Sequence, residues 1–163
     1  MLRRIVCGLL MLTMLFGLAL AETPDAAVTV DLALDDFTLA LESSWVIDTG
    51  KAEDETMVAS ASSIDGQDLL MVFLSAEGDE NEAVSMAAVN EYSSGIRRGA
   101  TEEVNGVKVI FAAAEEGSMA CAYFSVNGHV YTVTLQSNRE DATSEELAET
   151  LGNLMKTMTP NIG

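Results

Sequence analysis

The sequence predicts an α+β domain in which hairpins build an antiparallel sheet and two amphipathic helices pack against it. Three observations lead to this fold class. Tight-turn dipeptides stand between strand-like segments, only two segments carry apolar residues at helical spacing, and strands and helices do not alternate as in a parallel sheet. The middle strands are apolar on both faces, so each face needs a cover, which an α/β/α sandwich would provide.

Strand-like alternation first becomes clear at Phe37, where apolar residues alternate with Thr38 and Ala40 as far as Leu41. Ser43-Ser44-Trp45 follows this short strand. The segment before it, 22–34, has a weaker pattern and fits either a strand or an ordered tail. Residues 49–55 form a polar loop.

Three dipeptides then mark hairpin turns: Asp65-Gly66, Asn105-Gly106 and Asn127-Gly128. A two-residue hairpin loop needs positive φ at its central residues, which Asp, Asn and Gly adopt most readily. The strands that these turns join are, in order, 57–64 with 67–75, 101–104 with 107–113, and 119–126 with 129–137. The register of the second hairpin places Glu103 opposite Lys108. Residues 69–74 are apolar on both faces, as expected of a central strand covered on each side.

The first helix is predicted to begin at Asp79, which can cap it with Glu82 three residues later. Gly95 ends the helix, and Arg97-Arg98 follow where a helix carries partial negative charge. The apolar residues that we expect on its buried stripe are Val84, Ala87, Ala88, Tyr92 and Ile96.

The second helix has a full capping box, Thr143-Ser144-Glu145-Glu146. Leu147, Leu151, Leu154 and Met158 follow at spacings that place them on one face, and Pro160 is predicted to stop the helix.

The first 21 residues have the pattern of a cleaved secretory signal peptide. Arg3 and Arg4 precede an apolar run that ends in Ala19-x-Ala21, after which the chain turns polar at Glu22. A retained membrane anchor is the alternative, but the run is shorter than the roughly 20 apolar residues of a spanning helix. A lipoprotein is disfavoured because Cys7 lies near the start of the run. We therefore expect cleavage between Ala21 and Glu22, a leader over 22–35 and one domain over 36–163, secreted or periplasmic and without stable membrane insertion.

The charge balance restricts the partners. The chain has 26 acidic and 8 basic residues, a net charge of −18; loss of Arg3 and Arg4 would leave six basic residues and a net charge of −20. Such a field repels nucleic acid and anionic lipid and favours basic surfaces. Acidity that only keeps a secreted protein soluble is the alternative, and the scattered distribution of the charges fits it.

The elements in this order resemble PsbP-like domains and their bacterial extracytoplasmic relatives over about residues 36–159. The resemblance rests on Phe37-Thr38-Leu39-Ala40-Leu41-Glu42-Ser43-Ser44-Trp45, Val104-Asn105-Gly106-Val107, the strand with Tyr131 and the closing helix. Glu42 stands where PsbP-like domains often have Pro, so the corner before Trp45 is expected to be built differently. The resemblance implies an α/β/α sandwich. It implies little about function, since the fold serves binding and assembly roles as different as those of a photosystem II subunit and a Mog-type Ran-binding protein.

Few residues invite catalysis. His129 is the only histidine, and alternation places it on one face with Tyr131, with Val126 directly across. No nucleophile accompanies it in the sequence. Cys121 falls on the opposite face, across from Thr134, and is expected to be a buried free thiol. Since Cys7 would leave with the signal peptide, no intramolecular disulfide is expected.

The sequence gives equally little indication of metal and ligand sites. Zinc would need a Cys/His cluster, and the acidic runs 53–55 and 79–82 lack the spacing of an EF-hand, so neither metal nor cofactor is predicted beyond weak calcium binding. Trp45 either closes one end of the core, as large aromatics usually do, or presents its ring to a ligand. Arg97-Arg98 can receive an acidic group, although the helix end already accounts for them.

Three functional hypotheses remain. The favoured one is a secreted or periplasmic, non-catalytic binding or accessory domain for a protein or small ligand, with a preference for basic surfaces. The first alternative is a small hydrolase that uses His129 with a carboxylate distant in sequence. The second is an acidic structural subunit of a cell-envelope assembly.

Overall fold

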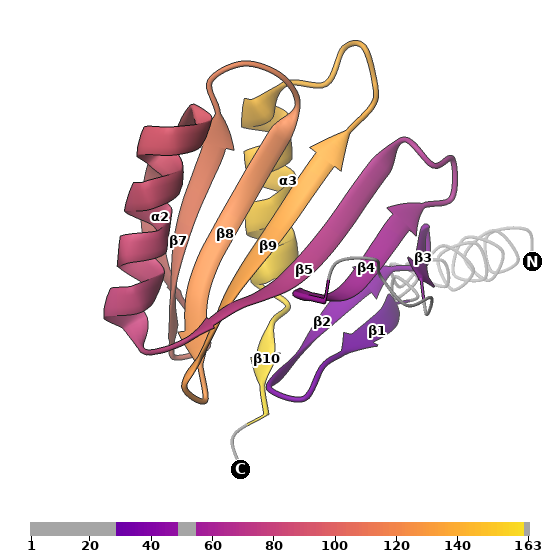
Figure 1. The fold of residues 1–163 in the computed structure, drawn as a ribbon. Coiled ribbons are helices and arrows are strands. Elements are labelled where there is room, and N and C mark those ends of the chain that lie inside the picture. The colour runs from indigo at the N-terminus through magenta and orange to yellow at the C-terminus, as the bar shows by residue number, and fades with distance from the viewer. Residues whose placement is uncertain (1–28, 49–54, 162–163) are drawn as a thin grey trace, which may run out of the picture.

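The structure, a computed structural model, describes residues 29–48 and 55–161, which form two antiparallel sheets and two helices (Figure 1). The elements in chain order are β1 (Thr29–Ala33), β2 (Phe37–Glu42), β3 (Trp45–Asp48), β4 (Met57–Ser63), β5 (Asp68–Glu77), α2 (Glu80–Ser94), β6 (Ile96–Val104), β7 (Val107–Ala114), β8 (Met119–Val126), β9 (His129–Ser137), α3 (Ser144–Met155) and β10 (Thr159–Pro160). The signal-peptide prediction and its cleavage point lie outside the described residues.

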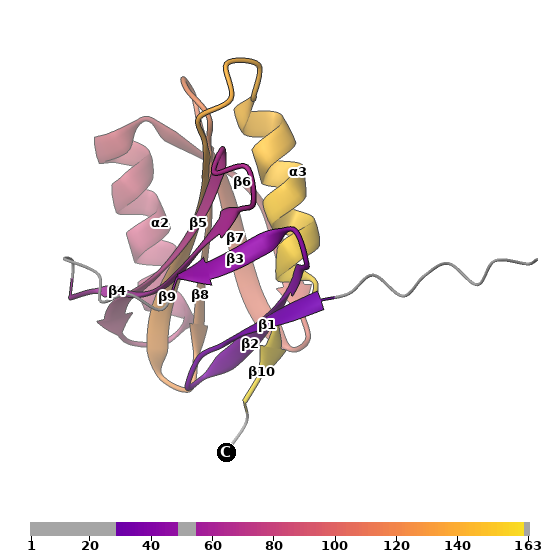
Figure 2. The same cartoon turned by 90° about the vertical axis from the view of Figure 1, so that its right-hand side faces the viewer.

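The larger sheet has seven strands in the order β3-β4-β5-β9-β8-β7-β6. Figure 2 shows α2 on one face of it and α3 on the other. A three-stranded sheet, β1-β2-β10, lies on the same side as α3. The predicted α+β sandwich is confirmed, with the small sheet as an additional cover. The chain passes from the small sheet to the large one at the corner between Glu42 and Trp45.

Two of the three predicted hairpin turns have the expected geometry. Asn105 and Asn127 have positive φ angles of 49° and 51°, and the glycines that follow them have φ of 83°. Glu103 pairs with Lys108 in register, although the Lys108 ammonium contacts Glu80 of α2, 2.6 Å away.

The first hairpin turn differs from the prediction. Its loop is 64–67, between Ser63 of β4 and Asp68 of β5, and only Gly66 within it has positive φ. The Asp65 carboxylate accepts hydrogen bonds from the Ser63 hydroxyl at 2.5 Å and the Gln67 amide at 3.1 Å. An Asp side chain that closes a turn in this way removes the need for a two-residue loop.

Helix α2 begins and ends as predicted, but its buried face was predicted only in part: Ala87 is buried and Val84 packs against the core beneath the helix. Asp79 caps it by accepting from the Asn81 amide at 2.8 Å, and Gly95 closes it with φ of 63°. The buried residues are Ala83 and Ala87, whereas Tyr92 is 96% exposed. Tyr92 lies five residues after Ala87, which is about 140° around a helix of 3.6 residues per turn. Small residues therefore make the contact, and the aromatic ring projects into solvent.

The strand after α2 is longer than predicted. It covers Ile96–Val104 rather than only 101–104, so Ile96, assigned to the helix stripe, is a strand residue. The register shifts between Arg98 and Thr101, which identifies a bulge at Gly99-Ala100. Because a bulge interrupts the two-residue alternation, the first half of this strand left no clear pattern in the sequence.

Helix α3 covers one side of the main core. Thr143 caps it by accepting from the Glu146 amide at 3.2 Å, and Leu147, Leu151 and Met155 are fully buried. The helix ends at Met155, before Pro160, which instead pairs with Phe37 in the small sheet; the expected stop at Pro160 is wrong. Leu154 is only half-buried, since Met155 occupies the buried position one residue later.

The core lies mainly between α3, the small sheet and the large sheet. Phe37, Phe124 and Tyr131 meet there with ring centroids 5.0 to 5.8 Å apart. Trp45 is half-buried and packs against this core, as favoured from the sequence. A smaller core under α2 contains Ala87, Ile110, Cys121 and Tyr123 among others. Helix α2 does not extend over all of β5, and Leu69 is 36% exposed, so the prediction that this strand is covered on both faces holds only in part.

Candidate functional sites

The histidine that the sequence singled out belongs to a polar cluster around Asp36, in the turn between β1 and β2. Asp36 is only 8% exposed. Its Oδ2 accepts from the Tyr131 hydroxyl at 2.7 Å and lies 2.6 Å from Nδ1 of His129. Its Oδ1 accepts from the Asn127 side-chain amide at 3.1 Å. We call these four residues the Asp36 cluster.

The hairpin between β8 and β9 explains the geometry of the cluster. Asn127 occupies the turn, and alternation along β9 places His129 and Tyr131 on the face that meets the small sheet. Asn161 connects the cluster to the segment after β10: its backbone amide donates to the Asp36 carbonyl at 2.8 Å, and its carbonyl accepts from Asn127 at 3.0 Å. The cluster therefore joins three segments that are remote in sequence.

The protonation states of Asp36 and Tyr131 fit the hydrogen bonds that these residues make. Burial alone would raise the pKa of Asp36, but hydrogen bonds from Tyr131, His129 and Asn127 outweigh it and hold that pKa below its ordinary value of 3.8. Burial, together with the carboxylate beside it, raises the pKa of Tyr131. At neutral pH the carboxylate is thus an ionised acceptor and the phenol a neutral donor.

The carboxylate distant in sequence that a hydrolase would require is therefore Asp36, but the available nucleophiles face elsewhere. Cys121 lies on the other face of the sheet, as predicted, buried with its Sγ 3.7 Å from the Thr134 hydroxyl. Burial raises the pKa of its thiol, which disfavours the reactive thiolate. Ser125 donates its hydroxyl to the Gly78 carbonyl at 2.7 Å. Both residues are bonded away from His129, whose Nδ1 contacts Asp36.

A groove at the other side of the sheet offers a different kind of site. It lies between α3 and the strands β6 and β7, with a volume of about 820 Å³. Helix α3 leaves β6, the edge strand, uncovered on this side. Phe111 and Ala113 of β7 form the floor, and Ala148 and Gly152 of α3 form one wall. The bulge of β6 contributes the other wall through Gly99 and Ala100. We call this the α3–β6 groove.

Charged side chains form the rim of this groove. Glu102 of β6 and Glu145 and Glu149 of α3 are exposed, and among the described residues none of the three has a hydrogen-bond or ion-pair partner. At one end Arg97 pairs with Glu115 at 2.6 Å. At the other end Lys156 contacts Asn153 at 3.3 Å.

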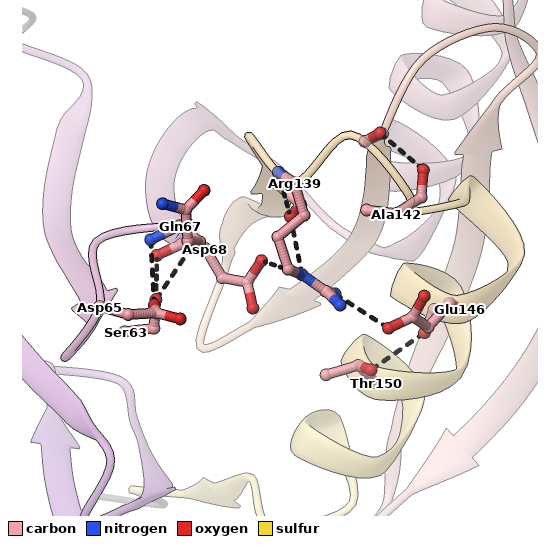
Figure 3. Close-up of polar contacts among 10 residues, drawn as sticks. Ser63, Asp65, Gln67, Asp68, Arg139, Ala142, Glu146 and Thr150 are labelled. Atoms are coloured by element: carbon pink, nitrogen blue, oxygen red, sulfur yellow. Dashed lines mark hydrogen bonds and ion pairs between the residues drawn. The ribbon is translucent and has the colours of Figure 1, made fainter.

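The side of α3 away from the groove is neutralised instead. Figure 3 shows Arg139 between Asp68 at the start of β5 and Glu146 on α3. Its guanidinium donates to Glu146 at 2.9 Å, and its Nε lies 3.4 Å from Asp68. Within one helix, therefore, the acid beside the turns is paired, and the two acids beside the groove are not.

A second, shallower cavity of about 510 Å³ lies beside α2 and is lined by Phe73, Met86, Cys121 and Tyr123 among others. Its buried polar groups are already bonded: the Tyr123 hydroxyl accepts from Asn90 at 3.1 Å, and Cys121 contacts Thr134. It offers little free polar chemistry.

The remaining candidates from the sequence lie apart. Arg98 pairs at 2.7 Å with Glu91, near the end of α2, and Arg97 pairs with Glu115, so carboxylates of the chain hold both of these cations. Trp45 lies on β3, at the opposite edge of the sheet from β6.

Neither the run 79–82 nor the described part of the run 53–55 belongs to a metal-binding group. The run 79–82 begins α2, with Asp79 as its cap and Glu80 paired with Lys108; in the run 53–55, residues 53 and 54 lie outside the described part. Within that described part, no group of three or more His, Cys, Asp or Glu residues is arranged to hold a metal, and no helix is long and apolar enough to cross a membrane.

Sequence reasoning missed the groove altogether. Its lining comes from two strands and a helix, and the bulge obscures one of the strands. The small residues Ala148 and Gly152, four apart beside the apolar stripe of α3, were the signal that could have found it.

Comparisons with known proteins identify the fold. No family model and no curated protein matches the sequence. Among solved structures, the chain is similar to the solution structure of cyanobacterial PsbP (CyanoP) from Synechocystis sp. PCC 6803, with a TM-score of 0.57 and 12% identity. The match covers 88% of this chain and 99% of that one. The chain therefore has a PsbP-like fold, as the resemblance in its motifs indicated.

Proposed function

We propose that this protein with a PsbP-like fold is a non-catalytic accessory domain outside the cytoplasm, which binds a partner through the α3–β6 groove. The observation that carries the proposal is the groove itself. Its volume of about 820 Å³ is in the range of ligand-binding sites, its floor is apolar, and its rim holds carboxylates that have no partner among the described residues. In the Asp36 cluster, in contrast, both carboxylate oxygens of Asp36, the Tyr131 hydroxyl and Nδ1 of His129 are bonded within the molecule.

The chemistry of the groove favours binding over reaction. Its lining contains Glu, Arg, Lys, Ser and Asn side chains but neither His nor Cys. The hydroxyl of Ser144 donates to the Gly117 carbonyl at 2.7 Å, so it is engaged in holding the start of α3. A nucleophile with a base beside it, the usual sign of covalent catalysis, is not part of this lining.

The proposed location follows from the sequence. Residues 1–21 have the pattern of an export signal, and the acidic remainder would have no affinity for anionic lipid or nucleic acid. Intact-mass analysis of the exported protein tests this part. A chain that begins at Glu22 would support it, and a chain that retains Arg3 and Arg4 would replace it with an anchored protein.

Filling the groove tests the binding surface. Gly152 lines the groove and a Cβ added there meets no atom within 4 Å, so the side chain of Gly152→Leu would start in open space. Thr150→Leu is the matched control: it adds an apolar side chain to an exposed position of the same helix outside the groove. With immobilised protein in extracts of the cell envelope, we expect Gly152→Leu to lose a partner that both the parent and the control retain. Equal capture by all three would exclude the groove.

The hydrolase hypothesis makes the opposite prediction. If His129 and Asp36 formed half of an active site, His129→Ala would abolish activity and leave capture by the groove unchanged. We expect His129→Ala to retain the biological activity of the parent, because neither Cys121 nor Ser125 reaches the ring.

A further inference from the structure

Other charged residues near the groove form ion pairs, whereas the three carboxylates of its rim have no partner among the described residues. Arg97 holds Glu115, Arg98 holds Glu91, and Arg139 holds Asp68 and Glu146. Glu102, Glu145 and Glu149 remain exposed, on both sides of one apolar floor. Lys156 is the only cation of the lining whose charge no carboxylate of the described chain neutralises.

The floor between these carboxylates can receive an apolar side chain. Phe111 is 8% exposed, and the walls on either side of it are small residues, Ala148 and Gly152 on α3 and Gly99 and Ala100 on β6. Their small side chains create the hollow without breaking the sheet. An occupant that buried apolar surface here would gain free energy in proportion to the area removed from water.

We propose that the α3–β6 groove binds a segment of a partner protein that carries an apolar side chain between lysine or arginine residues. This inference rests on the proposed function and names its partner by chemistry. The apolar side chain would contact Phe111 and Ala148, and the flanking cations would approach Glu145 and Glu149 on one side and Glu102 on the other.

The charge of the chain argues against other occupants. A second copy would bring another net charge of −18 to a face that already carries free carboxylates. Nucleic acid and anionic lipid meet the same repulsion. A bare metal ion needs converging oxygen ligands, whereas these carboxylates lie on two separate elements across the groove and no metal-holding group occurs among the described residues.

Three synthetic peptides with blocked ends provide the probes: Lys-Leu-Lys-Phe-Lys, Lys-Ser-Lys-Ser-Lys and Glu-Leu-Glu-Phe-Glu. They are titrated into the ¹⁵N-labelled exported protein while the backbone amide resonances are followed. The first peptide should shift the amides of Ala113, Ala148 and Gly152, and its Kd should rise with salt because exposed charges are screened over about 8 Å at physiological ionic strength. The other two should bind at least tenfold more weakly, since each lacks one half of the complementarity.

Charge reversal with a matched control locates the contact. The double variant Glu145→Lys/Glu149→Lys should weaken the basic peptide by about tenfold or more, as expected for the loss and reversal of two rim contacts. Glu42→Lys/Glu140→Lys changes the net charge equally at exposed positions outside the groove and should alter the Kd by less than about threefold. Equal weakening by the two double variants would show attraction to the overall charge alone and overturn the proposal.

The remaining outcomes distinguish failure of the proposed partner chemistry from failure of the proposed function. Binding of Lys-Ser-Lys-Ser-Lys or of spermine as tight as that of Lys-Leu-Lys-Phe-Lys would make the occupant a simple polycation and contradict the apolar contact. If no peptide binds but Gly152→Leu still loses its partner in extracts, then the groove is the site and the proposed partner chemistry is wrong. If Gly152→Leu captures what the parent captures, then the proposed function itself fails.

Discussion

The Asp36 cluster and the α3–β6 groove both contain carboxylates, but the carboxylate of the cluster is buried and those of the groove rim are exposed. The carboxylate of Asp36 is buried, and three side chains donate to it. The carboxylates of Glu145 and Glu149 are exposed and, within the described chain, accept from none. A buried charge must be paired because desolvation is costly, whereas an exposed charge is solvated by water and needs no partner within the molecule. We therefore expect the cluster to stabilise this molecule, and we propose that the groove binds another.

The two regions also differ in what they connect. The Asp36 cluster joins the β1–β2 turn, the β8–β9 turn and Asn161, and so closes the small sheet onto the large one. The groove joins only the edge strand to one side of α3, and Gly99 and Gly152 leave space there rather than filling it. Damage to the first should therefore appear as lost stability, and damage to the second as lost binding.

The largest effect should come from α3, which packs against the main core and forms one wall of the groove. Leu151→Asp would bury an unpaired charge at a fully buried position of α3, at a cost of several kcal/mol against a typical total of about 5–15 kcal/mol. We expect the variant to be unfolded at 25 °C by circular dichroism, while Thr150→Asp, at the adjacent exposed position, melts close to the parent. Coincident melts of all three would show that α3 does not dock as described.

The next effect separates the two regions by stability. Asp36→Ala would remove the acceptor of Tyr131 and leave that hydroxyl unpaired in the core, which costs about 1–3 kcal/mol for each buried polar group left unsatisfied. We expect a loss of about 2–4 kcal/mol in urea unfolding. The control is Asp35→Ala, the adjacent and exposed carboxylate, which should change the free energy of unfolding by less than about 0.5 kcal/mol. Similar losses in both variants would contradict a specific role for Asp36.

A smaller effect should appear in the pH dependence. Because the folded-state pKa of Asp36 lies below its ordinary value of 3.8, its stabilising contribution is complete above that value and is lost as the pH falls through the lower, folded-state pKa. The parent should therefore lose stability below about pH 4 more steeply than Asp36→Asn does, when unfolding free energies are compared between pH 2 and pH 6. Parallel profiles would show that Asp36 has the same pKa in the folded and unfolded states.

The smallest stability effect belongs to the groove. Gly152→Ala should stabilise the protein by about 0.5–1 kcal/mol, because alanine favours a helix over glycine and the added methyl meets no neighbour. Thermal melts of this variant and the parent measure the change. A destabilised variant would mean that the wall of the groove is in contact with another part of the chain.

Much of the fold could be predicted because short sequence motifs specify its turns and its helix starts. Asn105-Gly106 and Asn127-Gly128 specify two tight turns, and the capping residues Asp79 and Thr143 specify where the helices begin. The first hairpin turn differs because of a local contact, the Asp65 side chain with Ser63 and Gln67, whereas two other failures come from tertiary contact and strand pairing. Close packing through Ala83 and Ala87 turned the ring of Tyr92 outward, and the bulge at Gly99-Ala100 concealed half of β6.

The candidate site was recovered only in part, again because of tertiary contact. His129 and the strand face that it shares with Tyr131 follow from alternation after a known turn. Its partner Asp36 is 93 residues away and stands in a turn without a strand pattern, so only the folded chain identifies it. The groove is still less visible, because absence of side-chain volume at Gly99, Ala148 and Gly152 defines it rather than a motif.

The most direct test of the comparison measures binding and stability together in two variants. The Kd for Lys-Leu-Lys-Phe-Lys and the melting temperature are determined side by side for His129→Ala, Gly152→Leu and the parent. We expect His129→Ala to bind like the parent but melt at a lower temperature, and Gly152→Leu to bind at least tenfold more weakly without a lower melting temperature. Weakened binding in His129→Ala together with unchanged binding in Gly152→Leu would contradict the assignment of stability to the cluster and of binding to the groove.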